Sequence, residues 1–138
     1  MSSLIQKLSE QGVAHPPQFL PENTQYETYM GSVAYGVSSD ISDTDVYGFC
    51  IPRLEDIFPH LKGEVPGFGT QHHRFEQYQE HGIQWNGKEY DLSIYSIVKY
   101  LHLVMENNPN MIDSLYTPTN CVVHITQVQI PAYPITFE

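Results

Sequence analysis

The chain has 138 residues, about the length of one domain and enough to bury a core without disulfide bonds. Sixteen acidic residues against six Lys and Arg give a formal net charge of −10 with His neutral, which counts against an extended nucleic-acid surface lined by cations. The two cysteines lie far apart, the first residues lack the apolar core of a signal peptide, and no apolar run approaches about 18 residues, so we expect a cytoplasmic protein without a disulfide framework or a membrane partner.

The first part of the chain predicts one helix and two strands. Apolar residues recur at helical spacing from Leu4 and the pattern stops at Gly12, so we expect a helix over residues 3–12. After three prolines, a stretch rich in Tyr and Thr favours a strand over residues 25–31. A second strand is expected over residues 45–51, with alternate residues on opposite faces.

The middle of the chain predicts a loop and then a hairpin. Residues 52–69 are rich in Gly and Pro, so we expect a loop with one turn of helix. The dipeptide Asn86-Gly87 separates two strand-like runs, 73–83 and 88–94, and favours a type I′ turn because both of its residues tolerate positive φ. Apolar and polar residues alternate in the second run, which places Asp91 on its polar face.

The last part predicts two helices and another strand. Six apolar residues at i, i+3 and i+4 spacing are expected to form the core-facing stripe of a helix: Ile94, Ile97, Val98, Leu101, Val104 and Met105. Asn108 as N-cap and Pro109 as the first residue predict a short helix ending at Leu115. Residues 121–128 favour a strand or the start of another element. We therefore expect an α+β domain, a mixed sheet of four or five strands with helices packed mainly on one face and acidic residues on the open face.

Asp43 and Asp45 form the most informative pair in the chain. They lie two positions apart at the start of a strand, so their side chains share a face. Close carboxylates disfavour joint ionisation unless a cation lies between them, and a hard dication such as Mg²⁺ takes oxygen ligands. Taken alone, Asp-Thr-Asp is more often a solvated turn. An EF-hand is excluded because position 12 counted from Asp43, where a bidentate acid is required, is Leu54.

Two further features favour a site at this pair. Gly31-Ser32 lies where the first strand ends, and small residues let backbone N–H groups approach an anion. Asp91 lies on the polar face of a later strand, which a neighbouring pairing would bring beside the first two acids. The chemistry that this set supports is a metal-bridged triphosphate with a carboxylate near an attacking hydroxyl.

The ordered motifs resemble the DNA polymerase beta-like nucleotidyltransferase superfamily. They run Gly31-Ser32-x-Ala34-Tyr35-Gly36, then Ser42-Asp43-x-Asp45-x-x-Gly48, then Tyr90-Asp91-Leu92 and Asn107-Asn108-Pro109-Asn110. The string is similar to the branch of predicted nucleotidyltransferases related to RNA-ligase-associated and YcgL-like proteins. The resemblance covers roughly residues 20–125.

The resemblance implies a polymerase-beta-like core that transfers a nucleoside monophosphate from an NTP to an acceptor hydroxyl and releases pyrophosphate. It implies that Asp43, Asp45 and Asp91 are the catalytic residues and bind Mg²⁺, with Mn²⁺ as a second candidate. It also implies four nucleotide-binding residues, Gly31, Ser32, Tyr35 and Ser42. The acceptor stays open among an RNA end, a protein hydroxyl and a small molecule.

The chain departs from this branch in two ways. Members often carry Arg where Val33 stands, and they continue into helices richer in Lys and Arg, whereas here the pattern ends around Gln129. We therefore expect a nucleotidyltransferase core over residues 1–128 and a divergent tail over residues 129–138 in a truncated or frameshifted member. The alternatives to an active enzyme are a weak or inactive nucleotide- and metal-binding remnant and a purely structural fragment.

Other residues carry weaker signals. His73 and His81 share one side of a predicted strand, but eight residues separate them by about 26 Å, which disfavours a zinc site. Arg53, Arg74 and Lys99 are candidate triphosphate contacts, although a surface position is the commoner role for such residues. Cys50 is expected to be a small buried hydrophobic residue.

Overall fold

The structure is a computed structural model, and it describes residues 3–31 and 43–126. Its helices are α1 (Leu4–Glu10), α2 (Leu20–Asn23), α3 (Leu54–Ile57), α4 (Ile97–Met105) and α5 (Pro109–Leu115), with two 3₁₀ turns, η1 (Pro59–Lys62) and η2 (Thr119–Cys121). Its strands are β1 (Thr24–Met30), β2 (Thr44–Cys50), β3 (Gln77–Trp85), β4 (Lys88–Ser96) and β5 (Val122–Ile125). Within these residues, every helix is too short or too polar to cross a bilayer.

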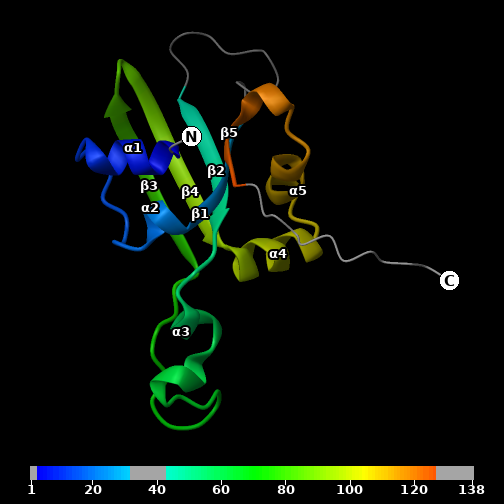
Figure 1. Cartoon of the computed structure of the whole chain (residues 1–138). Helices are drawn as coiled ribbons and strands as arrows, with labels where there is room; N and C mark the ends of the chain where they lie inside the picture. The colour runs from blue at the N-terminus through cyan, green and yellow to red at the C-terminus, as the bar shows by residue number, and fades with distance from the viewer. Residues whose placement is uncertain (1–2, 32–42, 127–138) are drawn as a thin grey trace, which may run out of the picture.

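A five-stranded mixed sheet forms the centre of the molecule (Figure 1). Its strand order is β3-β4-β2-β1-β5. β2 and β4 are parallel, and the other three neighbouring pairs are antiparallel. In the sequence, β3 comes between the parallel strands β2 and β4, after the lobe that contains α3 (Figure 1). In the sheet, β3 is the edge strand next to β4. The expected α+β class with a mixed sheet is confirmed.

The helices lie on both faces of the sheet, which differs from the expected arrangement on mainly one face. On one face, α1 packs with Val46 of β2 and Leu92 of β4 in the larger core cluster. On the other face, Tyr100 of α4 and its neighbours pack with aromatic residues of β2 and β4. Figure 1 shows α1 and α2 on one side of the sheet and α4 and α5 on the other.

The second layer of helices follows from the side chains of β2 and β4. The residues of β2 on the α4 side change along the strand from Asp45 to Tyr47 and Phe49, and the corresponding residues of β4 change from Asp91 to Tyr95. α4 and α5 cover the aromatic part of this face, because burying aromatic surface is favourable. The carboxylates at the other end stay partly exposed.

A buried carboxylate fastens α1 to the sheet. Glu27 of β1 is fully buried and accepts hydrogen bonds from the backbone N–H groups of Leu4 at 2.7 Å and Ile5 at 2.9 Å. These first-turn N–H groups have no partner inside the helix, and the positive end of the helix favours an anion. Burial nevertheless raises the pKa of Glu27, against the opposing effect of the two hydrogen bonds and Lys7.

Three predictions that depend on short stretches of sequence are confirmed: the end of the first helix, the hairpin turn and the cap of α5. α1 occupies residues 4–10 and is followed by Gly12, whose φ is 73°. The hairpin turn has φ of 51° at Asn86 and 77° at Gly87, as the expected type I′ turn requires. The side chain of Asn108 caps α5 by accepting from two backbone N–H groups, and the helix ends at Leu115.

Two regions differ from the expectation. β3 begins at Gln77 rather than residue 73, because Phe75 packs edge-on against Phe19 and its N–H points to the Asp56 carboxylate. Residues 52–69 contain both α3 and η1 rather than one helical turn. β5 forms over Val122–Ile125 within the expected range, and the expected tail over 129–138 lies outside the described residues.

The expected core-facing stripe of α4 is only partly correct. Ile94 is fully buried and Val104 packs against the core, but half of the expected stripe faces solvent. Val98, Leu101 and Met105 are 59%, 50% and 80% exposed, whereas Tyr100 is 1% exposed. Ile94 belongs to β4, and the helix begins only after Ser96, whose side chain accepts the N–H of Lys99 as an N-cap. The orientation of the helix is set by Tyr100, which packs on Phe49 with ring centroids 4.9 Å apart and whose hydroxyl bonds to Ser114.

Gly48 generates a prediction about the sheet. A Cβ at this position would lie 2.0 Å from the Tyr26 carbonyl oxygen, so Gly48→Ala must push β1 and β2 apart. We expect a loss of about 2–4 kcal/mol in the free energy of unfolding, measured by urea denaturation. Gly12→Ala is the control, because nothing lies within 4 Å of its Cβ and only the positive φ is strained, at a cost of about 1 kcal/mol. Equal losses for the two variants would contradict the close approach at Gly48.

Glu27 generates a pH-dependent prediction. Its pKa in the folded protein is raised above the ordinary value of 4.5. Its contribution to the free energy of unfolding is therefore full below about pH 4.5 and is lost as pH rises through the folded-state pKa. Glu27→Gln lacks this titration, so its free energy of unfolding should increase relative to the parent protein as pH rises above 4.5. Urea unfolding at several pH values measures the difference, and a pH-independent difference would show that Glu27 titrates normally.

Candidate active site

Asp45 and Asp91 are direct neighbours across the parallel pair of strands. The register of β2 and β4 pairs Asp45 with Asp91, and the next residues of each strand pair in step. Directly opposed residues point to the same face of a sheet and approach each other closely. Both side chains are partly buried. The expected proximity of these two acids is therefore present in the structure.

Asp43 adds a third negative charge to this pair. It precedes β2 and is exposed, two residues before Asp45. The pKa of Asp45 is raised, first by burial, then by the charge of Asp91 and then by that of Asp43. The charge of His81 opposes these effects. The three acids thus form one electrostatic group, in which the negative charge at Asp45 is only partly compensated.

Gly31 leaves space beside the Asp45 carboxylate. It follows β1, and the last residue of β1, Met30, pairs with Asp45. A Cβ at Gly31 would lie 3.5 Å from Asp45 Oδ2, and its φ of 71° favours glycine. A backbone without a side chain therefore adjoins the carboxylate. The other implied nucleotide-binding residues, Ser32, Tyr35 and Ser42, lie outside the described residues.

A bulge in β3 holds Asp91 from the other side. The pairing of β3 with β4 shifts between Glu80 and Ile83, and Gly82 there has a φ of 71°. The Gly82 N–H donates to Asp91 Oδ1 at 2.8 Å, and His81 Nδ1 lies 3.4 Å from Asp91 Oδ2. Bulges re-aim side chains in this way beside functional sites.

The contact of His81 with Asp91 is missed by the sequence analysis. Residue spacing pairs His81 only with His73 as a metal ligand, but His73 precedes β3 and does not share that strand. A glycine inside a strand is a recognised signal of a bulge, so Gly82 marks the position in the sequence. The partner of the bulge could not be read from the sequence, because it depends on the register of β3 with β4.

The donor atoms suit a hard dication. Asp43, Asp45 and Asp91 supply carboxylate oxygens, which Mg²⁺ prefers, and their mutual repulsion would fall on metal binding. Over residues 3–31 and 43–126, however, no three His, Cys, Asp or Glu side chains are placed so that they could hold a metal ion together. The residues therefore fit Mg²⁺ by chemistry and charge without forming a closed set of ligands.

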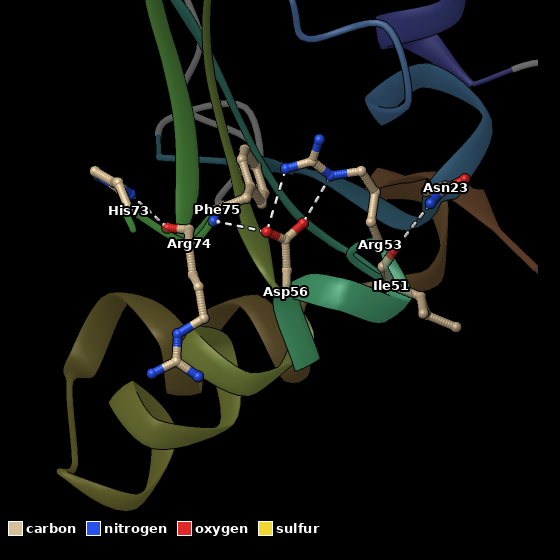
Figure 2. Close-up of polar contacts among 7 residues, drawn as sticks. All are labelled: Asn23, Ile51, Arg53, Asp56, His73, Arg74 and Phe75. Atoms are coloured by element: carbon tan, nitrogen blue, oxygen red, sulfur yellow. Dashed lines mark hydrogen bonds and ion pairs between the residues drawn. The ribbon is translucent and has the colours of Figure 1, made fainter. Parts of the chain in front are cut away.

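The candidate triphosphate contacts lie elsewhere. Arg53 makes two hydrogen bonds to Asp56, at 2.9 and 3.2 Å, so it supports the α3 lobe (Figure 2). Arg74 points away from this pair, and it lines a cavity together with Lys99 where β2 and β4 end (Figure 2). Cys50 is fully buried, as expected, and burial raises the pKa of its thiol to about 12.

The shared electrostatics of the acids are testable without metal or nucleotide. Asp91→Asn removes the second cause of the raised pKa of Asp45 and leaves burial, the first, in place. We expect the pKa of Asp45 to fall while staying above its ordinary value, as measured by the ¹³C shift of its carboxyl carbon during a pH titration. Glu10→Gln removes the same charge on α1 and should leave the pKa of Asp45 unchanged. A pKa of Asp45 that does not respond to Asp91→Asn would show that the two acids are not coupled.

One of three comparisons with known proteins identifies a family for this chain. A search of curated proteins and a search of solved structures each found no significant match. Residues 4–130 match the RNA repair pathway DNA polymerase beta family, and this match covers nearly the whole chain. The expected resemblance to the polymerase beta-like nucleotidyltransferases is thereby confirmed. The chain belongs to the RNA repair pathway DNA polymerase beta family.

Proposed function

We propose that the chain is a Mg²⁺-dependent nucleotidyltransferase, which transfers a nucleoside monophosphate from an NTP to an acceptor hydroxyl. The observation that carries the proposal is the pairing of Asp45 with Asp91 across β2 and β4, with Gly31 against the Asp45 carboxylate. The family match supports the same class of reaction. The acceptor oxygen forms a bond to the α-phosphorus, the bond from that phosphorus to the leaving pyrophosphate breaks, and the hydroxyl proton passes to a base.

The carboxylates have distinct roles in this proposal. Asp43, Asp45 and Asp91 would hold Mg²⁺, which, when bound, neutralises charge on the phosphate oxygens. Asp91 would also help to accept the proton of the acceptor hydroxyl. The Gly82 N–H and His81 hold one oxygen each, which fixes the direction of the Asp91 carboxylate. Fixing a reacting group in advance lowers the entropic cost of the reaction.

The nucleotide would bind at the end of β1. Gly31 brings the backbone beside Asp45 without a side chain, and backbone N–H groups in such turns bind phosphates. By resemblance, Ser32, Tyr35 and Ser42 complete this part of the site. The description of the family favours an RNA end as the acceptor over a protein hydroxyl or a small molecule.

One observation favours binding without efficient turnover as the second candidate. Of the described charges, only His81 lowers the pKa of Asp45, and no Lys or Arg contributes. Phosphoryl-transfer enzymes use cations besides the metal to stabilise the charge on the phosphate. A chain without such a cation would bind a metal-nucleotide complex and react slowly.

Thermal unfolding tests the binding part of the proposal. Each of the four NTPs should raise the Tm with Mg²⁺ present and not with EDTA, because a ligand at 100 times its Kd adds about 2.7 kcal/mol, or several degrees. Asp43→Ala and Asp45→Asn should abolish the shift, whereas Glu10→Gln, with the same change of charge on the other face, should keep it. A Tm shift that survives Asp45→Asn would place the nucleotide elsewhere on the protein. No Tm shift with any NTP would leave only the structural-fragment alternative.

Pyrophosphate release separates the two candidates. An active enzyme releases pyrophosphate with an RNA end, and Asp91→Asn should lower kcat while changing the Kd for the NTP less. Metal-dependent binding without pyrophosphate release from any acceptor class would favour the binding remnant.

A further inference from the structure

A cavity lies at the opposite end of the sheet from the carboxylates. It has a volume of about 380 Å³ and is lined by residues that follow β2, precede β3 and begin α4. Ser96, at the end of β4, lines it and is five residues beyond Asp91, or about 17 Å along the strand. Its volume falls within the range of small-molecule sites, about 300–1,000 Å³. The cavity is therefore separate from the candidate active site and large enough for a small ligand.

Two cations that have no side-chain partner among the described residues line this cavity. Arg74 and Lys99 are two of the six Lys and Arg residues of a chain whose net charge is −10. Among residues 3–31 and 43–126, neither side chain has a hydrogen-bond or ion-pair partner, whereas Arg53 close by is held by Asp56 (Figure 2). Two unpaired like charges at one cavity repel each other, and an anion between them would relieve this repulsion.

The other charged side chains that line the cavity do not neutralise Arg74 and Lys99, so both cations can contact an anion. Asp56 lines the wall, but Arg53 and the Phe75 N–H occupy its carboxylate. His102 faces Glu106, with Nε2 and Oε1 3.1 Å apart. The exposed carboxylate of Glu76 is the remaining acid in the described lining. As far as the described part of the chain shows, the cavity thus combines two unpaired cations with one opposing acid.

The surroundings of the cations suit a phosphate attached to an apolar group. α4 begins beside the cavity, and its first N–H groups have no acceptor within the helix. The Ser96 side chain accepts one of them, the N–H of Lys99. The positive end of the helix adds to the attraction for an anion. Phe75 and Val98 supply apolar walls.

We propose that this cavity binds the phosphate group of a small phosphorylated ligand, of about the size of a mononucleotide. Arg74 and Lys99 contact the phosphate oxygens, and Phe75 and Val98 contact the remainder of the ligand. The site needs neither a metal nor the nucleotidyltransferase reaction, so it does not depend on the proposed function.

Calorimetric titration of the full chain tests the proposal. The probes are AMP, inorganic phosphate and adenosine, each in EDTA so that metal-dependent binding at the carboxylates is absent. AMP should bind, and adenosine should not bind over the same concentration range. Competition of inorganic phosphate with AMP would show that the phosphate alone is recognised, and binding of AMP without competition would show that the nucleoside is needed as well. Both results support the site, and absence of AMP binding by the parent protein overturns it.

Charge variants locate the binding. Arg74→Gln together with Lys99→Gln should weaken AMP binding at least about tenfold, because hydrogen bonds to charged groups are lost. Lys88→Gln, at the start of β4, is the matched single-charge control and should leave the Kd unchanged. Glu76→Gln should tighten binding by removing the opposing charge, and it tests the site even if the double variant does not fold.

Two results would contradict the proposed location of the phosphate site. AMP binding that is unaffected by the double variant, or that is lost in Asp45→Asn instead, would place AMP at the carboxylates and overturn the proposal. A Kd that changes equally in Lys88→Gln and in Lys99→Gln would show only a dependence on net charge and would overturn it as well.

Discussion

The parallel pairing of β2 with β4 is the constraint on which the site depends. It places Asp45 opposite Asp91 although 46 positions separate them in the sequence, and it does so because the whole pair is in register. A shift by one residue would turn one of the two side chains to the α1 face of the sheet, among buried apolar residues. The register is therefore fixed by the hydrophobic core, and the carboxylates lie together as its consequence.

The same two strands explain why the site stays open. On the α4 side, their residues are acidic at one end and aromatic at the other, so α4 and α5 cover only the aromatic end. The cations Arg74 and Lys99 lie beyond that aromatic end, at the cavity beside the first turn of α4. The sheet thus separates the negative group of the candidate active site from the positive group of this cavity by the length of the strands.

Local signals gave reliable predictions where the residues involved are neighbours in the chain. The Asn86-Gly87 turn, the Asn108 cap of α5 and the end of α1 before Gly12 each depend on the φ or the side chain of one or two residues. Half of the stripe expected on α4 is exposed, because spacing alone gives the period of a helix and not the face that will be covered. The buried face of α4 is set by the packing of Tyr100 on Phe49, a residue of β2 that is far away in the sequence.

The sequence by itself determined the class of the fold, most of the elements and the acids that carry the proposed chemistry, because alternation, caps and motif order are properties of short segments. Tertiary structure alone decided that the helices lie on both faces, that His81 and Gly82 hold Asp91, and that Arg74 and Lys99 share a cavity. These facts depend on strand register and on packing between segments far apart in the chain. Residue spacing does not encode such contacts, since the burial of the whole core selects among the possible pairings.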